Sequence, residues 1–318
     1  MTGHTRLKAA IKLKMKEVPV IRLDDLTDEQ VKAFRLVDNK TAEIADWDMD
    51  ALIQELNEIE MDLSMFDLEI DDDDIVVVED DYDVVVPEEP ISKRGDIWQL
   101  GRHRLMCGDS TSIDDVNKLM NGERADMVFT DPPYNVAFTG RSGNFDVIKN
   151  DDLSEDEFED FINATISIIK YINAPIHYIW CNWKFYGILQ GKLDYKSCIV
   201  WAKNVFGLGK GYRHQHEFCL FNGEIDENIK NESDLWEIAK DTNYVHPTQK
   251  PIALCGRALG NHKDVNNVID LFGGSGSTLM ACEQLNRISY MMELDPRYVD
   301  VIIKRWEDYT GLKAEKIN

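Results

Sequence analysis

The chain has 318 residues, 43% of them apolar, and a formal net charge of −24. That length and apolar content can support one large α/β domain and a smaller unit. No apolar run reaches the length of a membrane-spanning helix, and residues 1–16 lack the features of a signal peptide, so a cytoplasmic protein is expected. Six scattered cysteines without a C-x-x-C pair indicate buried reduced thiols.

The negative charge is distributed unevenly. A strongly acidic chain argues against a nucleic-acid partner, because phosphate binding depends on Lys and Arg. However, residues 61–90 alone contribute −13 and residues 151–160 contribute −7. Between Lys184 and Arg213, six bases face one acid. This basic stripe is compatible with a solvated surface or with phosphate binding.

The first ninety residues read as helices followed by an acidic segment. Residues 27–43 begin with a Thr27 cap, and residues 48–60 repeat apolar side chains at helical spacing. Residues 70–92 mix acids, Val runs and two prolines, which favours a linker or an edge strand. We therefore place a domain boundary in this segment.

Strands and helices alternate in the rest of the chain, which predicts an α/β fold with a mostly parallel sheet covered on both faces. The acidic helix that starts near residue 152 carries an apolar stripe and is predicted to pack on the core. The predicted strands are residues 125–130, 176–181, 196–203, 216–221, 265–272 and 287–293. The predicted helices are residues 155–172, 250–260, 277–286 and 296–311.

Residues 268–285 form an apolar strand, a turn with three glycines and an amphipathic helix. Gly273, Gly274 and Gly276 allow positive φ and close approach of a ligand, and the new helix offers free N–H groups. A tight corner between strand and helix would explain the glycines equally well. The next strand ends in Glu293, where an acid at the sheet edge can accept hydrogen bonds from ribose hydroxyls. Turn and acid together indicate an adenosine-containing ligand.

Two motifs carry a resemblance to a known family. The stretch "DLFGGSGST", residues 270–278, resembles the S-adenosylmethionine turn of DNA amino-methyltransferases, and "DPPY", residues 131–134, resembles their catalytic motif. The resemblance implies a Rossmann-like methyltransferase fold, with a mostly parallel seven-stranded sheet and helices on both faces, and S-adenosylmethionine as cofactor. The implied cofactor-binding residues are Asp109, Thr248, Gln249, Lys250, Asp270, Phe272, Gly273, Gly274, Ser275, Gly276, Ser277, Thr278, Glu293 and Asp295.

The chemistry of residues 131–134 agrees with a catalytic role. The exocyclic amine of adenine is a poor nucleophile, because its lone pair is delocalised into the ring. Asp131 and the carbonyl of Pro132 can each accept a hydrogen bond from one N–H group of this amine, which favours a pyramidal nitrogen. Pro133 helps to fix the chain, and the Tyr134 ring offers a face on which the base can stack. The base must first rotate out of the duplex. A strand that ends in an ordinary Asx-Pro turn is the alternative.

The order of the motifs indicates a subclass. The catalytic motif precedes the cofactor turn by about 140 residues. This permuted order resembles the beta group of these enzymes, whereas protein glutamine and ribosomal guanine methyltransferases usually place the cofactor turn first. Asp131 in place of Ser favours adenine N6 as the target. Cytosine N4 is an alternative, and an RNA or protein methyltransferase is another.

Double-stranded DNA is the implied partner. The predicted target-recognition region, residues 223–245, is short and acidic, which predicts a short recognition sequence. Residues 135–150 contain two glycines and predict a mobile loop that closes over the flipped base. His214 and His216 could bind a metal, but no further group of metal ligands lies at suitable spacing in the sequence. No metal site is therefore predicted. Contacts with DNA are expected from a second subunit of a homodimer and from Arg141, Lys203, Lys210 and Arg213.

Residues 3–43 resemble the later part of a ParB-like domain, in which a turn matching Gly3–Arg6 binds nucleotide phosphate. The strands that precede this turn in that superfamily are missing, so residues 1–69 are predicted to be a truncated docking remnant. The acidic linker, residues 70–92, would join it to a catalytic domain, residues 93–318. Such fusions are common in phages and prophages, which implies a mobile-element origin. A cognate restriction enzyme is a further partner that the resemblance to DNA methyltransferases allows. A ParB-like nucleotide- or DNA-binding module with a decayed methyltransferase is the alternative.

Overall fold

The computed structural model describes residues 27, 77–80, 86–135, 151–189, 191–207, 211–227, 229, 231–239 and 249–318. All of these except Thr27 belong to one compact unit, which begins at Ile75. Apart from Thr27, the predicted ParB-like remnant lies outside the described residues. Within the described part, no helix has the length and apolarity needed to cross a membrane.

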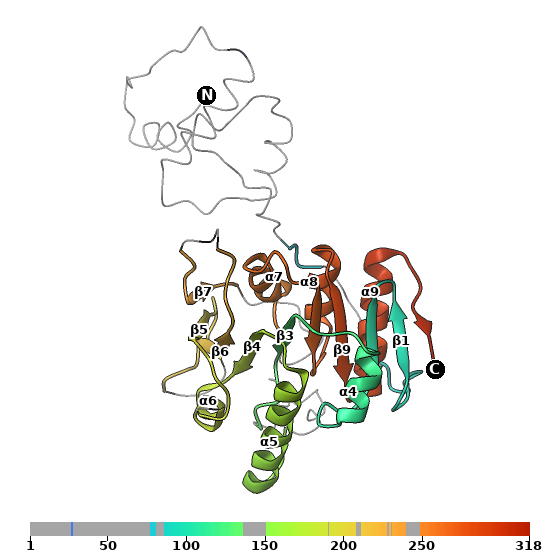
Figure 1. Ribbon diagram of the computed structural model, residues 1–318, viewed down its shortest axis with the longest axis horizontal. Helices are drawn as coiled ribbons and strands as arrows, with labels where there is room; N and C mark the ends of the chain where they lie inside the picture. The colour runs from blue at the N-terminus through green and yellow to red at the C-terminus, as the bar shows by residue number, and fades with distance from the viewer. Residues whose placement is uncertain are drawn as a thin grey trace, which may run out of the picture. The chain divides into compact units, whose positions relative to one another are not determined.

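The described strands form one sheet with the order β10-β1-β2-β9-β8-β3-β4-β6-β5-β7 (Figure 1). Their bounds are β1 Ile97–Leu100, β2 His103–Cys107, β3 Met127–Thr130, β4 Ile176–Cys181, β5 Ser197–Ala202, β6 His216–Asn222, β7 Leu235–Glu237, β8 Asn267–Asp270, β9 Ile288–Glu293 and β10 Glu315–Lys316.

The middle of this sheet is parallel. Strands β2, β9, β8, β3 and β4 run side by side in the same direction, and β6 then inserts antiparallel between β4 and β5. Parallel strands are covered on both faces and therefore read as continuous apolar runs, as the fully buried β3 does. The seven strands from β2 to β5 confirm the predicted Rossmann-like, mostly parallel sheet.

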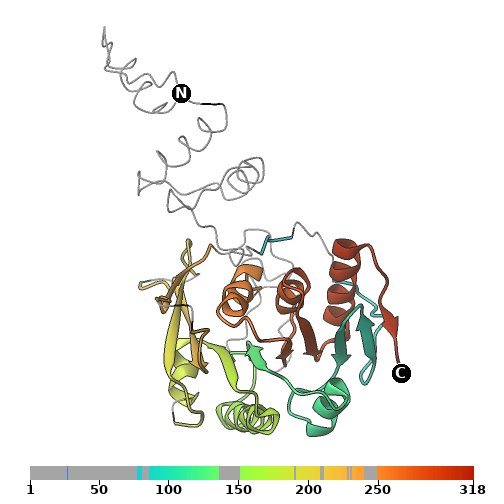
Figure 2. The ribbon, with the colours of Figure 1, turned by 45° about the horizontal axis from the view of Figure 1, so that its top comes forward.

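Helices cover both faces of the sheet (Figure 2). Their bounds are α4 Ile113–Met120, α5 Glu155–Ile172, α6 Trp183–Leu189, α7 Ile252–Gly260, α8 Ser277–Gln284 and α9 Pro296–Thr310. One apolar core lies between the sheet and α7, α8 and α9, and a second lies between the sheet and α4, α5 and α6. The predicted helices at residues 155–172 and 296–311 are α5 and α9, each within one residue of the predicted bounds.

The acidic start of α5 is explained by capping. The Ser154 side chain accepts a hydrogen bond from the backbone N–H of Glu157, and the Glu157 carboxylate accepts from Ser154 in return. This capping box satisfies two N–H groups that a helix start leaves open, and acids there also interact favourably with the helix dipole. The predicted apolar stripe, including Phe158 and Ile166, is buried against the sheet.

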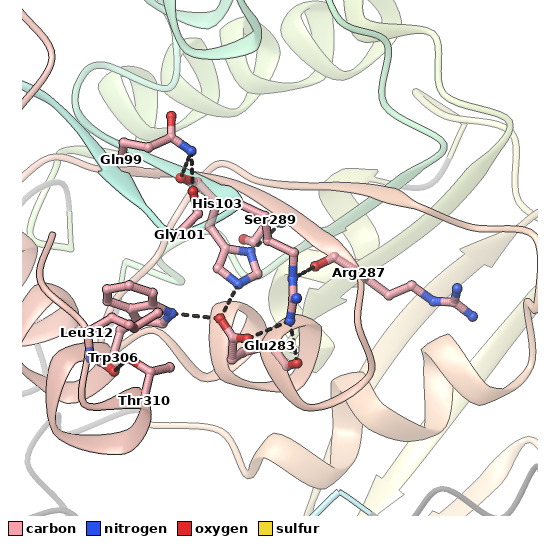
Figure 3. A network of polar contacts seen from close by, with 10 residues as sticks. Gln99, Gly101, His103, Glu283, Arg287, Ser289, Trp306, Thr310 and Leu312 are labelled. Atoms are coloured by element: carbon pink, nitrogen blue, oxygen red, sulfur yellow. Dashed lines mark hydrogen bonds and ion pairs between the residues drawn. The ribbon is translucent and has the colours of Figure 1, made fainter. Parts of the chain in front are cut away.

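The β1–β2 hairpin is joined to α8, α9 and β9 by a polar network (Figure 3). The buried His103 ring accepts a hydrogen bond from the Ser289 N–H at Nδ1 and, at Nε2, lies 2.8 Å from Glu283 Oε2. The Trp306 indole N–H donates to the same Glu283 oxygen at 2.7 Å. The hydrogen bond from His103 is the main cause that lowers the pKa of Glu283 to about 2. Arg102 adds an ion pair to this carboxylate.

Part of the predicted acidic linker packs on the helices. Val77 is buried against Gly256 of α7, where an added Cβ would lie 2.2 Å from a Val77 methyl carbon, so this close approach requires glycine. The Val78 backbone donates to and accepts from the Gln284 side chain. Asp80 forms an ion pair with Arg305, and both side chains are buried.

Candidate active site

Four parallel strands end at the same edge of the sheet, which is where ligands bind in open α/β sheets. Strand β8 ends at Asp270, beside Met291 of β9. Strand β9 ends at Glu293, beside Cys107 of β2. Strand β3 ends at Thr130, so that Asp131 is the first residue beyond it. The topology therefore places the predicted catalytic acid at the same edge as the glycine turn.

Asp270 closes the β8 end of the turn. Its Oδ1 accepts hydrogen bonds from Thr130 Oγ1 at 3.1 Å and from the Phe272 N–H at 3.0 Å, and its Oδ2 accepts from Thr278 Oγ1 at 2.7 Å. Burial raises the pKa of Asp270 to about 7, against the effect of these donors. The Asp270 carboxylate thus links the end of β3, the glycine turn and the first residues of α8.

Two features of the turn require glycine, namely positive φ and close packing against a neighbouring strand. Gly274 and Gly276 adopt φ of +54° and +88°, a backbone conformation that side chains disfavour. A Cβ on Gly273 would lie 2.8 Å from the Met291 side chain. Among the described residues no side chain caps helix α8 at Gly276, so its first turn is left for a ligand with acceptor groups. An adenosine-containing ligand fits this cradle.

Glu293 lies directly against the same turn. One of its oxygens accepts from the Gly274 N–H at 2.8 Å and the other accepts from the Asp295 N–H at 2.8 Å. Burial raises the pKa of Glu293 to about 7. Asp295 in turn caps α9 by accepting a hydrogen bond from the Arg297 N–H. A carboxylate fixed in this way retains lone pairs that can accept hydrogen bonds from ribose hydroxyls.

The other predicted cofactor residues surround this turn. Asp109 follows β2, accepts hydrogen bonds from both the N–H and the hydroxyl of Thr111, and lies 3.8 Å from the Arg94 guanidinium. The Phe272 ring packs edge-on against Phe161 of α5. The Ser277 hydroxyl donates to the carbonyl of Lys250 at 2.7 Å. The side chains of Gln249, Ser275 and Thr278 are buried, and Thr248 lies outside the described residues.

The segment after β3 is held by polar contacts at both ends. The Tyr134 hydroxyl donates to Asp131 Oδ1 at 2.5 Å, and Pro132 between them is buried. The Asn135 side chain bonds the backbone of Leu153 in both directions, at 2.7 and 2.8 Å. Asn135 has φ of +56°. Asp131 and Tyr134 are thereby fixed relative to each other and to the start of the following helix.

Two charged residues join this pair, and neither was predicted there. The Lys250 ammonium forms an ion pair with Asp131 Oδ2 and lies 3.0 Å from Glu217 Oε2. Glu217 forms a second ion pair with Lys203. The Lys250 Nζ also lies 5.5 Å from the centre of the Trp180 ring. We call Asp131, Tyr134, Lys203, Glu217 and Lys250 the Asp131 cluster.

Burial and neighbouring charges set the protonation of the Asp131 cluster. Burial alone would raise the pKa of Glu217, but the Lys250 and Lys203 ammonium groups hold it at about 2. Burial opposes the charge of Lys250, yet Asp131 and Glu217 raise its pKa. Burial raises the pKa of Asp131, and Lys250 opposes that shift. Burial also raises the pKa of Tyr134, which keeps its hydroxyl a donor.

The predicted site residues are thus divided between two neighbouring groups. Lys250 was assigned to the cofactor; its backbone contacts the glycine turn, whereas its ammonium lies in the Asp131 cluster. Lys203 was assigned to DNA, and the structure places it against Glu217. Arg213 is exposed on the loop between β5 and β6, stacked over Phe206. Arg141 and Lys210 lie outside the described residues.

Glu217 is the functional candidate that the sequence analysis missed. It is the second residue of β6, in the otherwise apolar stretch "HEFCLF" that was predicted as a strand. An acid inside a buried strand needs a partner, because an isolated buried charge is costly. That single acid was the available signal.

Comparison with known proteins identifies the family of this chain. A family model described as a DNA methylase matches residues 125–305. The chain is 27% identical over 254 residues to the Type II methyltransferase M.HpaI of Haemophilus parainfluenzae, a match that covers 66% of this chain and 76% of that protein. It is 25% identical over 232 residues to the Type II methyltransferase M.HinfI of Haemophilus influenzae, which covers 59% of this chain and 64% of that protein.

Among solved structures, the chain is similar to the complex of M1.HpyAVI with SAM. The identity is 23%, the TM-score is 0.47, and the match covers 64% of this chain and 98% of that one. It is also similar to the cytosine-N4-specific PvuII DNA methyltransferase, with 15% identity, a TM-score of 0.47, and coverage of 64% of this chain and 85% of that one.

Proposed function

Since this chain belongs to the DNA methylase family, we propose that it transfers a methyl group from S-adenosylmethionine to the N6 amine of a flipped adenine in duplex DNA. The observation that supports this proposal best is the position of Asp131. The structure places it one residue beyond β3, at the sheet edge that also holds the glycine turn and Glu293. An acceptor for an amine and a cradle for an adenosine-containing cofactor therefore adjoin each other.

The residues of the turn fit S-adenosylmethionine. When bound, this cofactor supplies a methyl group activated by a sulfonium sulfur. Glu293 would accept hydrogen bonds from the ribose hydroxyls, and the start of α8 would face the ligand with backbone N–H groups. Phe272 would contact the adenine portion, and the backbone of Lys250 fixes Ser277 at the start of α8.

Asp131 and Tyr134 would hold the target amine. The Asp131 carboxylate and the Pro132 carbonyl would each accept a hydrogen bond from one N–H group of the amine. The lone pair of the amine nitrogen would then point toward the methyl donor. The Tyr134 hydroxyl orients Asp131. After transfer, the nitrogen carries one hydrogen in excess of its neutral state, and Asp131 is positioned to accept that proton.

Adenine is proposed as the target base because residue 131 is Asp. Cytosine N4 is the second candidate, because the amine and the neighbouring ring nitrogen of cytosine have the same donor and acceptor order. The two are separated by the modified base that sequencing reports.

An exposed aromatic and basic surface would contact the DNA. Phe206, Tyr212 and Trp183 are all exposed, with the Arg213 guanidinium over the Phe206 ring and the Lys184 ammonium 5.8 Å from the centre of the Trp183 ring. Aromatic faces stack on unpaired bases, and cations neutralise phosphates. A second copy of the chain and a restriction enzyme that reads the same site are further proposed partners.

The proposal is tested by offering purified protein and labelled S-adenosylmethionine to duplex DNA, tRNA, ribosomal RNA and protein. Label in duplex DNA alone is expected. Long-read modification sequencing of DNA from cells that express the protein then reports the base and its sequence context. Label in RNA or protein, with none in DNA, would reject the proposal.

A further inference from the structure

The Lys250 ammonium is enclosed by oxygen atoms of the Asp131 cluster. Among the described residues it contacts Asp131 Oδ2, Glu217 Oε2 at 3.0 Å and the Tyr134 hydroxyl at 3.3 Å. Only 9% of its side chain is exposed. With Lys203, the cluster contains two carboxylates and two ammonium groups, so its charges balance. Such burial is tolerated because each charge is paired.

Both oxygens of Asp131 are engaged in this state. Oδ1 accepts from the Tyr134 hydroxyl, and Oδ2 accepts from the Lys250 ammonium. An amine that donates to Asp131 must therefore share one of these oxygens or displace Lys250 from Oδ2. When Lys250 is displaced, its contact with Glu217 at 3.0 Å still holds it at the site. One of its three N–H donors is then released beside the incoming base.

The bases differ in what they present at this point. In adenine and cytosine, the exocyclic amine is a donor, and the adjacent ring nitrogen is an acceptor. In guanine and thymine, the corresponding positions hold a carbonyl acceptor and a ring N–H donor. A carboxylate beside an ammonium therefore matches adenine and cytosine. It opposes guanine and thymine, because their carbonyl would face the Asp131 carboxylate and their ring N–H would face the Lys250 ammonium.

We propose that Lys250 reads the target base by donating a hydrogen bond to the ring nitrogen next to the methylated amine, N1 in adenine. The inference rests on the proposed function and adds a specificity-determining residue to it. Glu217 is a positioning residue, since it holds Lys250 and is itself held by Lys203. The pair of Asp131 and Lys250 admits bases with an amine beside a ring acceptor and rejects guanine and thymine.

The test uses a duplex in which the target adenine is replaced by 1-deazaadenine, which keeps the amine but has C–H in place of N1. Single-turnover methyl transfer is measured with wild type and with Lys250→Met. Wild type is expected to transfer roughly 10- to 100-fold more slowly to the analogue, the range for one hydrogen bond to a charged group. Lys250→Met is expected to be slow on both duplexes and to treat them alike. If sequencing reports cytosine N4, 3-deazacytosine replaces the analogue.

Comparing the adenine-to-analogue rate ratio of Lys250→Met with that of wild type cancels any effect of the analogue on amine reactivity. Lys250→Met leaves two carboxylates without their shared cation, so the double variant Lys250→Met/Glu217→Gln removes one of them and is measured beside it. Lys304→Met is the matched control, because Lys304 pairs with Asp308 on the exposed surface of α9. That control is expected to discriminate between the duplexes as wild type does.

Two results would overturn the inference. One is a wild-type rate that is equal on adenine and 1-deazaadenine; the other is undiminished discrimination by both Lys250 variants. In either case methyl transfer to adenine itself continues, so the proposed function survives. A wild-type protein that methylates no DNA would instead overturn the proposed function and this inference together.

Discussion

Lys250 and Asp131 lie 119 positions apart in the chain and form a partly buried ion pair. The backbone of Lys250 accepts a hydrogen bond from Ser277, at the start of the helix that follows the glycine turn. One residue therefore contacts the glycine turn through its carbonyl and Asp131, the proposed catalytic residue, through its ammonium. Lys250 thus links the glycine turn to Asp131, and a substitution at one of them is expected to alter the position of the other.

Gly273→Ala is expected to weaken S-adenosylmethionine binding and to lower stability by about 1–3 kcal/mol, the usual cost of overpacking. The added methyl would lie 2.8 Å from the Met291 side chain, so β9 or the turn must shift. Titration calorimetry and thermal unfolding measure the two effects. Gly187→Ala on α6 is the control, because nothing in the described part lies within 4 Å of a Cβ at that position. Equal affinity of Gly273→Ala and wild type would contradict the role given to the turn.

Asp80→Ala is expected to lower stability by up to about 3–5 kcal/mol, because it removes an ion-pair partner of the buried Arg305. Arg305 also donates to the Ser275 carbonyl at 2.9 Å, so the KM for S-adenosylmethionine should rise as well. For the same reason, deletion of residues 1–85 should abolish activity, whereas deletion of residues 1–74 should retain it. Unchanged melting temperature and KM in Asp80→Ala would show that this anchor is dispensable.

Stability should fall as the pH is lowered from about 4.5 toward 2, because Glu283 has an ordinary pKa of 4.5 when unfolded and about 2 when folded. A carboxylate with a depressed folded pKa stabilises the protein above the unfolded value and loses that contribution as it is protonated. Burial also lowers the pKa of His103, which penalises acid below pH 6.5. Melting temperatures of Glu283→Gln should therefore depend less steeply on pH between 5 and 3 than those of wild type. Parallel curves would argue against this network as an acid-sensitive element.

Arg213→Ala and Tyr212→Ala should each raise the KM for DNA and leave the affinity for S-adenosylmethionine unchanged. Tyr212 is fully exposed, and Arg213 carries a positive charge on the same loop. Loss of one phosphate contact should also reduce the slope of log affinity against log salt by about 1 for Arg213→Ala, with no such change for Tyr212→Ala. DNA binding measured over a range of salt concentrations checks both expectations. Wild-type KM values in both variants would place the DNA elsewhere.

Much of the fold could be predicted from local patterns. Strand β4 and helix α5 begin and end where the sequence analysis placed them, because a continuous apolar run and a capped apolar stripe are strong local signals. Strands β1 and β2 were missed. They have four and five residues, and they are defined mainly by pairing with each other and with β10 and β9, which a local pattern does not reveal.

The site was predictable where a motif coincides with a strand end, as at Asp131 and Glu293. The partners of Asp131 were not predictable in this way. Glu217 lies on β6, which pairs with β4 although α6 and β5 separate these two strands in the sequence. Lys250 was correctly placed near the turn by its backbone, but the direction of a long flexible side chain depends on the charges that surround it in the folded protein.

The central claim is that Asp131 orients the target amine. It is tested most directly by measuring the single-turnover rate of methyl transfer to duplex DNA and the affinity for S-adenosylmethionine in Asp131→Ala. The account predicts a fall in rate of at least about 100-fold, as expected when a reacting group loses its alignment, with cofactor affinity unchanged. Methylation at the wild-type rate by a folded Asp131→Ala protein would contradict it.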